Sequence, residues 1–204
     1  MGQPEAREIH PVAAPEVPPE DAARLRATMA AYGRPVRRVG YWREGRGFNA
    51  RCGLGRLEVT QQFLRGDRDA EECALAHEAG HRDGWGAIAA AALVVGAGEV
   101  ALAALPLPVS PGVGGMLASL ARGAVALGTA VGGLAALAAG CRRDEYRADL
   151  TAARIVGKER YLEFLADPDL APDPPRDWTW WFSSWHPTRE QRMRRVERAS
   201  GEAG

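Results

Sequence analysis

The chain has 204 residues and carries 26 basic and 26 acidic side chains. This length allows one catalytic domain, or one small domain with a membrane element, and the zero net charge argues against a nucleic-acid partner. The three cysteines, Cys52, Cys73 and Cys141, are an odd number without close spacing, so we expect neither a disulfide framework nor a cysteine metal site.

The first forty residues predict a tail followed by a short helix. Residues 1–20 contain several prolines and charges and lack the apolar core of a signal peptide, so they are expected to form a disordered tail. Residues 21–32 are typical of a short helix with Asp21 as the N-cap.

A small antiparallel sheet and a further helix are expected next. The apolar residues of 36–42 and of 54–63 indicate two strands, separated by a glycine-rich segment. Asp69 is then followed by acidic residues and by good helix formers without proline, which predicts a helix through His81.

The predicted helix contains the run His77-Glu78-Ala79-Gly80-His81. Residues four positions apart share one face of a helix, so the two imidazoles can bind one zinc ion while Glu78 takes a proton from a metal-bound water. A chance pattern on a solvated helix face is the alternative. Two of the four histidines of the chain lie in this run, which favours the metal site.

A third ligand is expected where the chain returns from a long apolar stretch. Glu145 and Asp149 are four positions apart, so one could bind the metal and the other could orient a histidine ligand from behind. The alternative is a solvated acidic face that pairs with Arg142 and Arg143.

The fourth histidine, His186, precedes Pro187 and a basic segment. A histidine or arginine near the metal could stabilise an oxyanion. A capping loop before a basic surface helix, with Thr188 as the cap, explains the same residues.

Four features follow one another along the chain: HEAGH, an apolar segment, DEYRAD, and SWHP with Arg192 six residues after its histidine. In this order they resemble the motifs of the HtpX-type membrane peptidases and the CAAX prenyl endopeptidases, which are gluzincins. The resemblance covers roughly residues 35–195. It implies zinc as the cofactor, with three ligands, His77, His81 and Glu145, and with Glu78 as the general base.

The same resemblance implies supporting residues around the zinc. Asp149 corresponds to a supporting aspartate, and His186 and Arg192 correspond to residues that contact substrate and oxyanion. Asn49 and Ala50 correspond to an edge strand, where an extended substrate would pair by β-augmentation. Unlike the HtpX-type proteins, this chain has no membrane helices before its catalytic helix.

The apolar stretch of residues 86–141 is expected to form a transmembrane hairpin. Residues 87–105 and 123–141 are each long enough to span a bilayer, and the turn between them, around Pro106, Pro108 and Pro111, carries no charge. Arginines flank the outer ends, which indicates cytoplasmic ends. Glu99 opposes insertion, and a soluble hairpin packed on the domain is the alternative.

Together these features predict an α+β fold: a mainly helical, zincin-like domain of residues 21–204 with a small antiparallel sheet and the inserted hairpin. The predicted function is a membrane-associated endopeptidase that binds one zinc per chain and cleaves a peptide or protein substrate. The catalytic domain and both termini are then cytoplasmic. A non-catalytic binding module and a soluble processing peptidase for one peptide are the alternatives.

Overall fold

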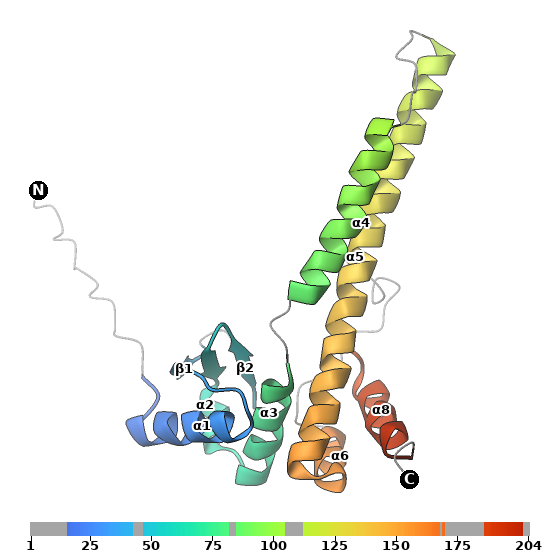
Figure 1. The fold of residues 1–204 in the computed structure, drawn as a ribbon. Coiled ribbons are helices and arrows are strands. Elements are labelled where there is room, and N and C mark those ends of the chain that lie inside the picture. The colour runs from blue at the N-terminus through green and yellow to red at the C-terminus, as the bar shows by residue number, and fades with distance from the viewer. Residues whose placement is uncertain are drawn as a thin grey trace, which may run out of the picture.

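The fold is mostly helical with one small sheet, which confirms the predicted α+β class. The computed structural model describes residues 16–42, 47–81, 85–104, 112–167, 169 and 186–201. Its elements in chain order are α1 (Pro19–Ala31), β1 (Arg38–Tyr41), β2 (Ala50–Gly53), β3 (Arg56–Val59), α2 (Gln61–Arg65), α3 (Arg68–Gly80), α4 (Trp85–Ala104), α5 (Val113–Val156), α6 (Lys158–Ala166) and α8 (Arg189–Gly201). The sheet and the shorter helices form a globular part, from which α4 and much of α5 project (Figure 1).

The sheet is mixed, so the prediction of a purely antiparallel sheet is wrong. Its strand order is β1–β3–β2. β2 and β3 form an antiparallel hairpin across a turn in which Leu54 and Gly55 have φ of 48° and 73°, as in the tight turns that suit hairpins. Because of this turn, β2 pairs with one edge of β3. β1 pairs with the other edge, where no tight turn sets its direction, and it runs parallel to β3.

Two helices begin earlier than predicted. α1 begins at Pro19, whose fixed φ suits the first turn of a helix, so the disordered tail predicted for residues 1–20 is wrong at its last residues; residues 1–15 are outside the described part. α3 begins at Arg68 because Asp67, and not Asp69, is the N-cap and accepts a hydrogen bond from the Ala70 N–H.

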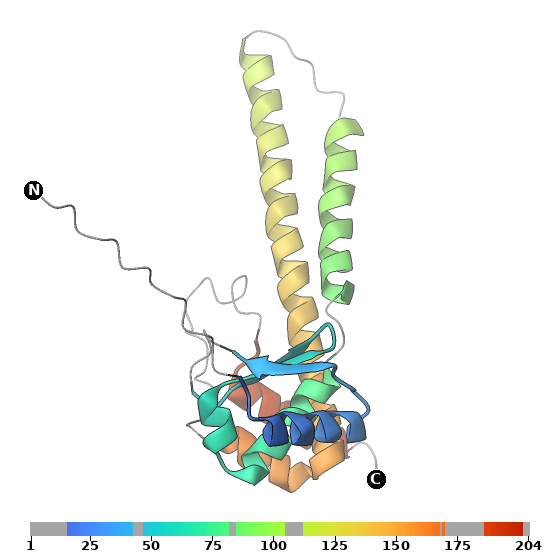
Figure 2. The same ribbon diagram turned by 90° about the vertical axis from the view of Figure 1, so that its left-hand side faces the viewer.

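α3 lies at the centre of the globular part, between two apolar clusters. Its Leu75 packs with α1, the sheet and α2, and its Cys73 and Ala76 pack with α5, α6 and α8. Viewed from the side, the sheet lies over α1 and α3 at the base of the hairpin (Figure 2). α3 is therefore fixed from both sides, which holds the residues of its last turn in place.

α5 is a single helix from Val113 to Val156. The sequence predicts a helix that starts after Cys141, but nothing in the described residues interrupts α5 there. The helix ends at Gly157, which has a φ of 95°, and α6 follows directly. The helix that leaves the apolar stretch is thus the same helix that carries Glu145.

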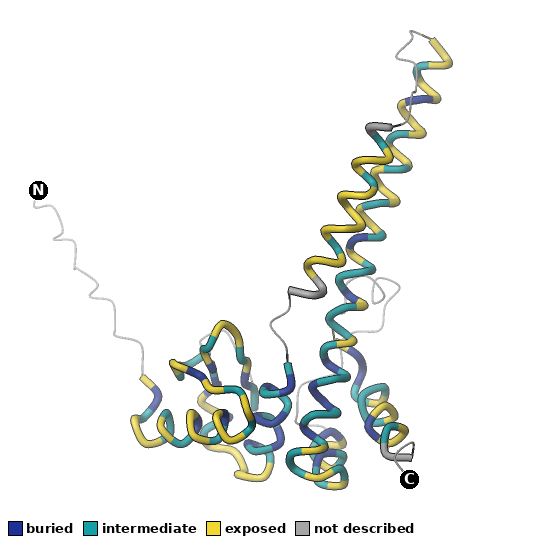
Figure 3. The backbone as a smooth tube through the Cα atoms, in the orientation of Figure 1, coloured by how far each residue is buried: buried dark blue, intermediate teal, exposed yellow. Residues whose placement is uncertain are grey.

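α4 packs along α5 with small residues at the contact. A Cβ on Gly98 would lie 2.1 Å from Thr129 Cγ2, and a Cβ on Gly133 would lie 2.9 Å from Val95 Cγ2. Away from this contact the hairpin is largely exposed, unlike the globular part (Figure 3). Its exposed large apolar residues are Ile88, Leu93, Val94, Val95, Val100, Val113, Met116, Leu117, Leu120, Leu127, Val131 and Leu134.

By length and composition, α5 could cross a membrane. Its apolar window has a mean hydropathy of 1.8, and only 11% of that window is buried. α4 contributes a shorter apolar stretch, Ile88–Leu102.

Candidate metal centre

The end of α3 and the lower half of α5 bring the predicted metal ligands together. His77 and Glu78 lie in the last turn of α3, and His81 is the residue at its C-cap. Gly80 allows the two helices to approach closely, because a Cβ at this position would lie 2.6 Å from the Cα of Ala148 on α5. The glycine within the motif therefore has a packing reason.

The donor groups of the three predicted ligands converge. The Nε2 atoms of His77 and His81 are 3.1 Å apart. Oxygen atoms of the Glu145 carboxylate lie 3.3 Å from His77 Nε2 and 3.7 Å from His81 Nε2. Together with a Glu78 oxygen, the histidine nitrogens form a group within 4.8 Å that could hold a metal ion.

The other ring nitrogen of His77 faces a buried polar network. His77 Nδ1 lies 3.0 Å from Asp149 Oδ1 and 3.1 Å from the Tyr161 hydroxyl oxygen. The Tyr161 hydroxyl donates to Asp149 at 2.7 Å, and Arg192 donates to both Asp149 oxygens through Nε at 3.1 and 3.0 Å. Asp149 is fully buried, and this network fixes the ring so that Nε2 points toward Glu145.

Asp149 therefore lies behind the His77 ring, and its supporting role at a zinc site stays a prediction. Arg192 contacts His77 only on the Nδ1 side in the described residues, with its Nη2 at 3.3 Å. These contacts account for a positioning role, and the predicted contact of Arg192 with an oxyanion stays a prediction.

His81 has an orienting carboxylate of its own, which the sequence reasoning missed. Asp144 Oδ2 lies 2.8 Å from His81 Nδ1. Arg147 donates to Asp144 and, at 3.3 Å, to the carbonyl of Gly80. Asp144 directly precedes Glu145 and lies four residues before Ala148. Its position next to a predicted ligand is the feature of the sequence that could have identified it.

Glu78 is buried beside the histidines and is held by the sheet. Its Oε2 accepts a hydrogen bond of 2.7 Å from the backbone N–H of Cys52 on β2. Burial raises the pKa of Glu78, although the neighbouring histidines and this hydrogen bond oppose the shift. A carboxylate with a raised pKa, close to a metal site, is suited to accept a proton.

β2 is an edge strand beside the site; the resemblance implied an edge strand here, whereas the residues alone indicated a glycine-rich link between two strands. The Asn49 carbonyl accepts from the Thr60 N–H at 3.0 Å, so its hydrogen bonding is directed into the sheet. Alternation along an antiparallel ladder then directs the backbone groups of Ala50 and Cys52 to the open edge, which agrees with the Cys52–Glu78 bond. Of the two predicted residues, Ala50 is the one with outward-facing backbone groups.

His186 reaches the site from the segment before α8. Its Nδ1 lies 3.0 Å from Glu145 Oε1, although 70% of its side chain is exposed. This hydrogen bond raises the pKa of His186 against the opposing effect of burial. Thr188 caps α8 as predicted, since its hydroxyl accepts from the Gln191 N–H while its own N–H donates to the Gln191 side chain.

The carboxylates of Asp149 and Glu145 give the surroundings of His77 a negative electrostatic potential. Burial and Arg192 both lower the pKa of His77, but hydrogen bonds to Asp149 and Glu145 outweigh them and raise it to about 9. Burial raises the pKa of Glu145, but His186 and His77 more than compensate and hold it well below its usual range. A cation is therefore favoured at the point where these groups meet, whether it is a proton or a metal ion.

Tyr161 and the Cys52 N–H were also missed by the sequence reasoning. Tyr161 belongs to α6, where nothing in the local pattern marks it, and a backbone N–H carries no sequence signal. The tryptophans of residues 178–185 lie outside the described residues.

No protein-family model, no curated protein and no solved structure matches this chain.

Proposed function

We propose that this protein is a membrane-associated, zinc-dependent endopeptidase. His77, His81 and Glu145 hold one zinc ion, and Glu78 is the general base. The sequence resemblance to the HtpX-type and CAAX prenyl endopeptidases leads to the same proposal.

The spacing of the two imidazole nitrogens and the Glu145 carboxylate is the observation that carries the proposal. In a tetrahedral zinc site with ligand distances of about 2.0–2.2 Å, neighbouring donors lie roughly 3.3–3.6 Å apart. Here the two Nε2 atoms are 3.1 Å apart, Glu145 Oε2 lies 3.3 Å from His77 Nε2, and Glu145 Oε1 lies 3.7 Å from His81 Nε2. Two imidazoles and one carboxylate also form a donor set that is typical of catalytic zinc, with one position left for water or substrate.

A zinc ion in this site would acidify a bound water and polarise the carbonyl of a substrate. Glu78 would accept the proton of that water, and the Cys52 N–H holds its carboxylate beside the histidines. Asp149 and Asp144 keep the Nε2 atoms of the two imidazoles directed to the site. The substrate would lie extended along β2 and pair with Ala50, which aligns a peptide bond beside these groups.

Membrane association is supported by the exposed apolar surface of the hairpin. α5 has the length and composition of a spanning helix, and α4 lies along it. We propose that both helices span the bilayer with the globular part and both termini in the cytoplasm, since Arg142 and Arg143 follow the apolar part of α5.

Metal content and turnover of the full chain, purified in detergent, test the chemistry. We expect one zinc per chain, which is lost when His77 and His81 are both replaced by alanine. Glu78→Gln should keep the zinc and lose turnover of a casein or peptide-library substrate by about 100- to 10,000-fold, because an amide cannot accept the proton. Glu163→Gln on α6 is the matched control and should leave both readouts unchanged.

Two outcomes would contradict this function. A full equivalent of zinc in the double histidine variant would place the metal elsewhere. Wild-type protein that binds zinc at this site but cleaves no substrate in the library would support a non-catalytic binding module instead.

A further inference from the structure

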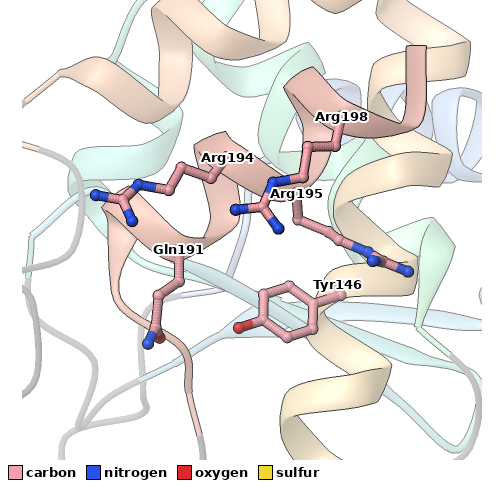
Figure 4. Close-up of a pocket in the computed structure, with 5 residues that line it drawn as sticks. All are labelled: Tyr146, Gln191, Arg194, Arg195 and Arg198. Atoms are coloured by element: carbon pink, nitrogen blue, oxygen red, sulfur yellow. The ribbon is translucent and has the colours of Figure 1, made fainter. Parts of the chain in front are cut away.

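A pocket of about 290 Å³ lies between α5 and α8 and is lined by Tyr146, Gln191, Arg194, Arg195 and Arg198 (Figure 4). Gln191 and the three arginines project from α8 around Tyr146 of α5. These four residues follow the spacing i, i+3, i+4 and i+7, which places them on one face of the helix. The pocket is therefore formed by one face of a helix and not by a loop.

Two of the three arginines have no acidic partner in the described part of the chain. Arg194 pairs with Glu190. Neither Arg195 nor Arg198 forms an ion pair with a described residue, and the nearby Glu197 does not line the pocket. Like charges at this helical spacing repel each other, so an anion between them would relieve a repulsion that α8 otherwise carries.

The donors of the pocket suit a phosphate group. Guanidinium groups bind phosphate oxygens through paired N–H donors. Gln191 accepts the Thr188 N–H through its Oε1 at 3.1 Å, which leaves its side-chain NH₂ to donate. The volume lies just below the range of about 300–1,000 Å³ that is usual for pockets of drug-sized ligands, so it suits a small headgroup.

The position of the pocket favours a lipid as the source of the phosphate, an argument that rests on the proposed membrane insertion. Arg142 is the first charged residue after the apolar part of α5, and Tyr146 lies four residues further. This separation is about 6 Å along a helix, and the headgroup layer on each side of a bilayer is roughly 5–7 Å thick. Tyr146 then lies at the depth of the headgroup phosphates.

We propose that this pocket binds the headgroup of an anionic glycerophospholipid of the cytoplasmic leaflet. Arg195 and Arg198 bind the phosphate, and Tyr146 and Gln191 donate to its oxygens or to the glycerol hydroxyls. The lipid thereby fixes α8, and with it Arg192 and the segment of His186, against the membrane end of α5.

Calorimetric titration of the full chain in detergent tests the site. The probes are dioctanoyl phosphatidylglycerol, dioctanoyl phosphatidylcholine and glycerol phosphate. We expect saturable binding of one phosphatidylglycerol per chain, at least tenfold tighter than either other probe. Arg195→Gln combined with Arg198→Gln should weaken this binding at least tenfold. The matched control, Arg26→Gln combined with Arg65→Gln, removes the same charge from α1 and α2 and should change it less than twofold.

Three results would overturn the proposal. The first is that both double variants weaken phosphatidylglycerol binding equally, and the second is that phosphatidylglycerol and phosphatidylcholine bind equally well. The third is that glycerol phosphate binds as tightly as the lipid, which would identify a free phosphate compound as the ligand. The titration needs neither zinc nor turnover, so a failed peptidase assay alongside intact lipid binding refutes only the proposed function. Circular dichroism of both double variants excludes unfolding as the cause of a loss.

Discussion

A close approach of α3 and α5 at Gly80 makes this the residue on which we expect the metal geometry to depend. A Cβ at position 80 would lie 2.6 Å from the Cα and 2.9 Å from the carbonyl oxygen of Ala148, and 3.0 Å from Thr151 Cβ. Two of these atoms belong to backbone inside a helix, so they cannot turn away. Gly80→Ala therefore requires the two helices to separate by several tenths of an ångström or more.

That separation would act on metal binding more than on folding. Overpacking typically costs about 1–3 kcal/mol, and the better helix propensity of alanine returns up to about 1 kcal/mol, so the fold should persist. His77 and His81 lie on the α3 side of the contact and Glu145 lies on α5, so the same movement displaces the carboxylate from the imidazoles. We expect zinc affinity to fall at least tenfold.

Competition of the purified protein with a chromogenic zinc chelator measures this affinity, and thermal unfolding of the metal-free protein measures the fold. Gly128→Ala is the matched control, since position 128 lies within α5 with nothing within 4 Å of a new Cβ. Unchanged zinc affinity in Gly80→Ala, with unchanged unfolding, would refute the argument that this contact sets the ligand geometry.

Three further predictions concern the surroundings of the site. Tyr161→Phe removes the 2.7 Å hydrogen bond to Asp149 and should lower zinc affinity by about 10- to 100-fold, as for other residues that orient a ligand; the same chelator competition measures it, and wild-type affinity would contradict it. Burial raises the pKa of Cys73 to about 11, so at pH 8.5 its thiolate fraction is roughly 150-fold below that of an ordinary thiol. Mass spectrometry after iodoacetamide treatment should find Cys73 modified only in unfolded protein. The wild-type chain should resist carbonate extraction from membranes, and a monodisperse state in detergent-free buffer would contradict the transmembrane hairpin.

Features that depend on short stretches of sequence were the predictable ones. The Thr188 cap is made within one helical turn, and the spacing of His77 and His81 follows from the helix that carries them. The residues alone left the choice between Glu145 and Asp149 as the third ligand open, and the resemblance was needed to single out Glu145, which lies 64 positions after His81.

Features set by packing between distant segments could not be predicted. The direction of β1 is not set by a tight turn, because β1 lies on the side of β3 away from β2. Asp144 and Tyr161 reach the histidines only because α5 and α6 pack on α3, and Glu78 meets Cys52 only because the sheet lies over that helix. The continuity of α5 is a similar case, since a change in composition near Cys141 is not a change in backbone conformation.

This continuity determines where the metal centre lies relative to the hairpin. His81 is four residues before Trp85, where α4 begins, and Glu145 is four residues after Cys141, where the predicted apolar segment of α5 ends. Both sides of the centre are thus close in sequence to the base of the hairpin, and on the α5 side four helical residues are about 6 Å long. Under the proposed insertion, the scissile bond of a substrate would have to lie at the membrane surface. A continuous helix cannot kink sharply to reach deeper into the cytoplasm without breaking its hydrogen bonds, so the proposed peptidase would favour peptide bonds close to the bilayer over equally extended ones that lie far from it.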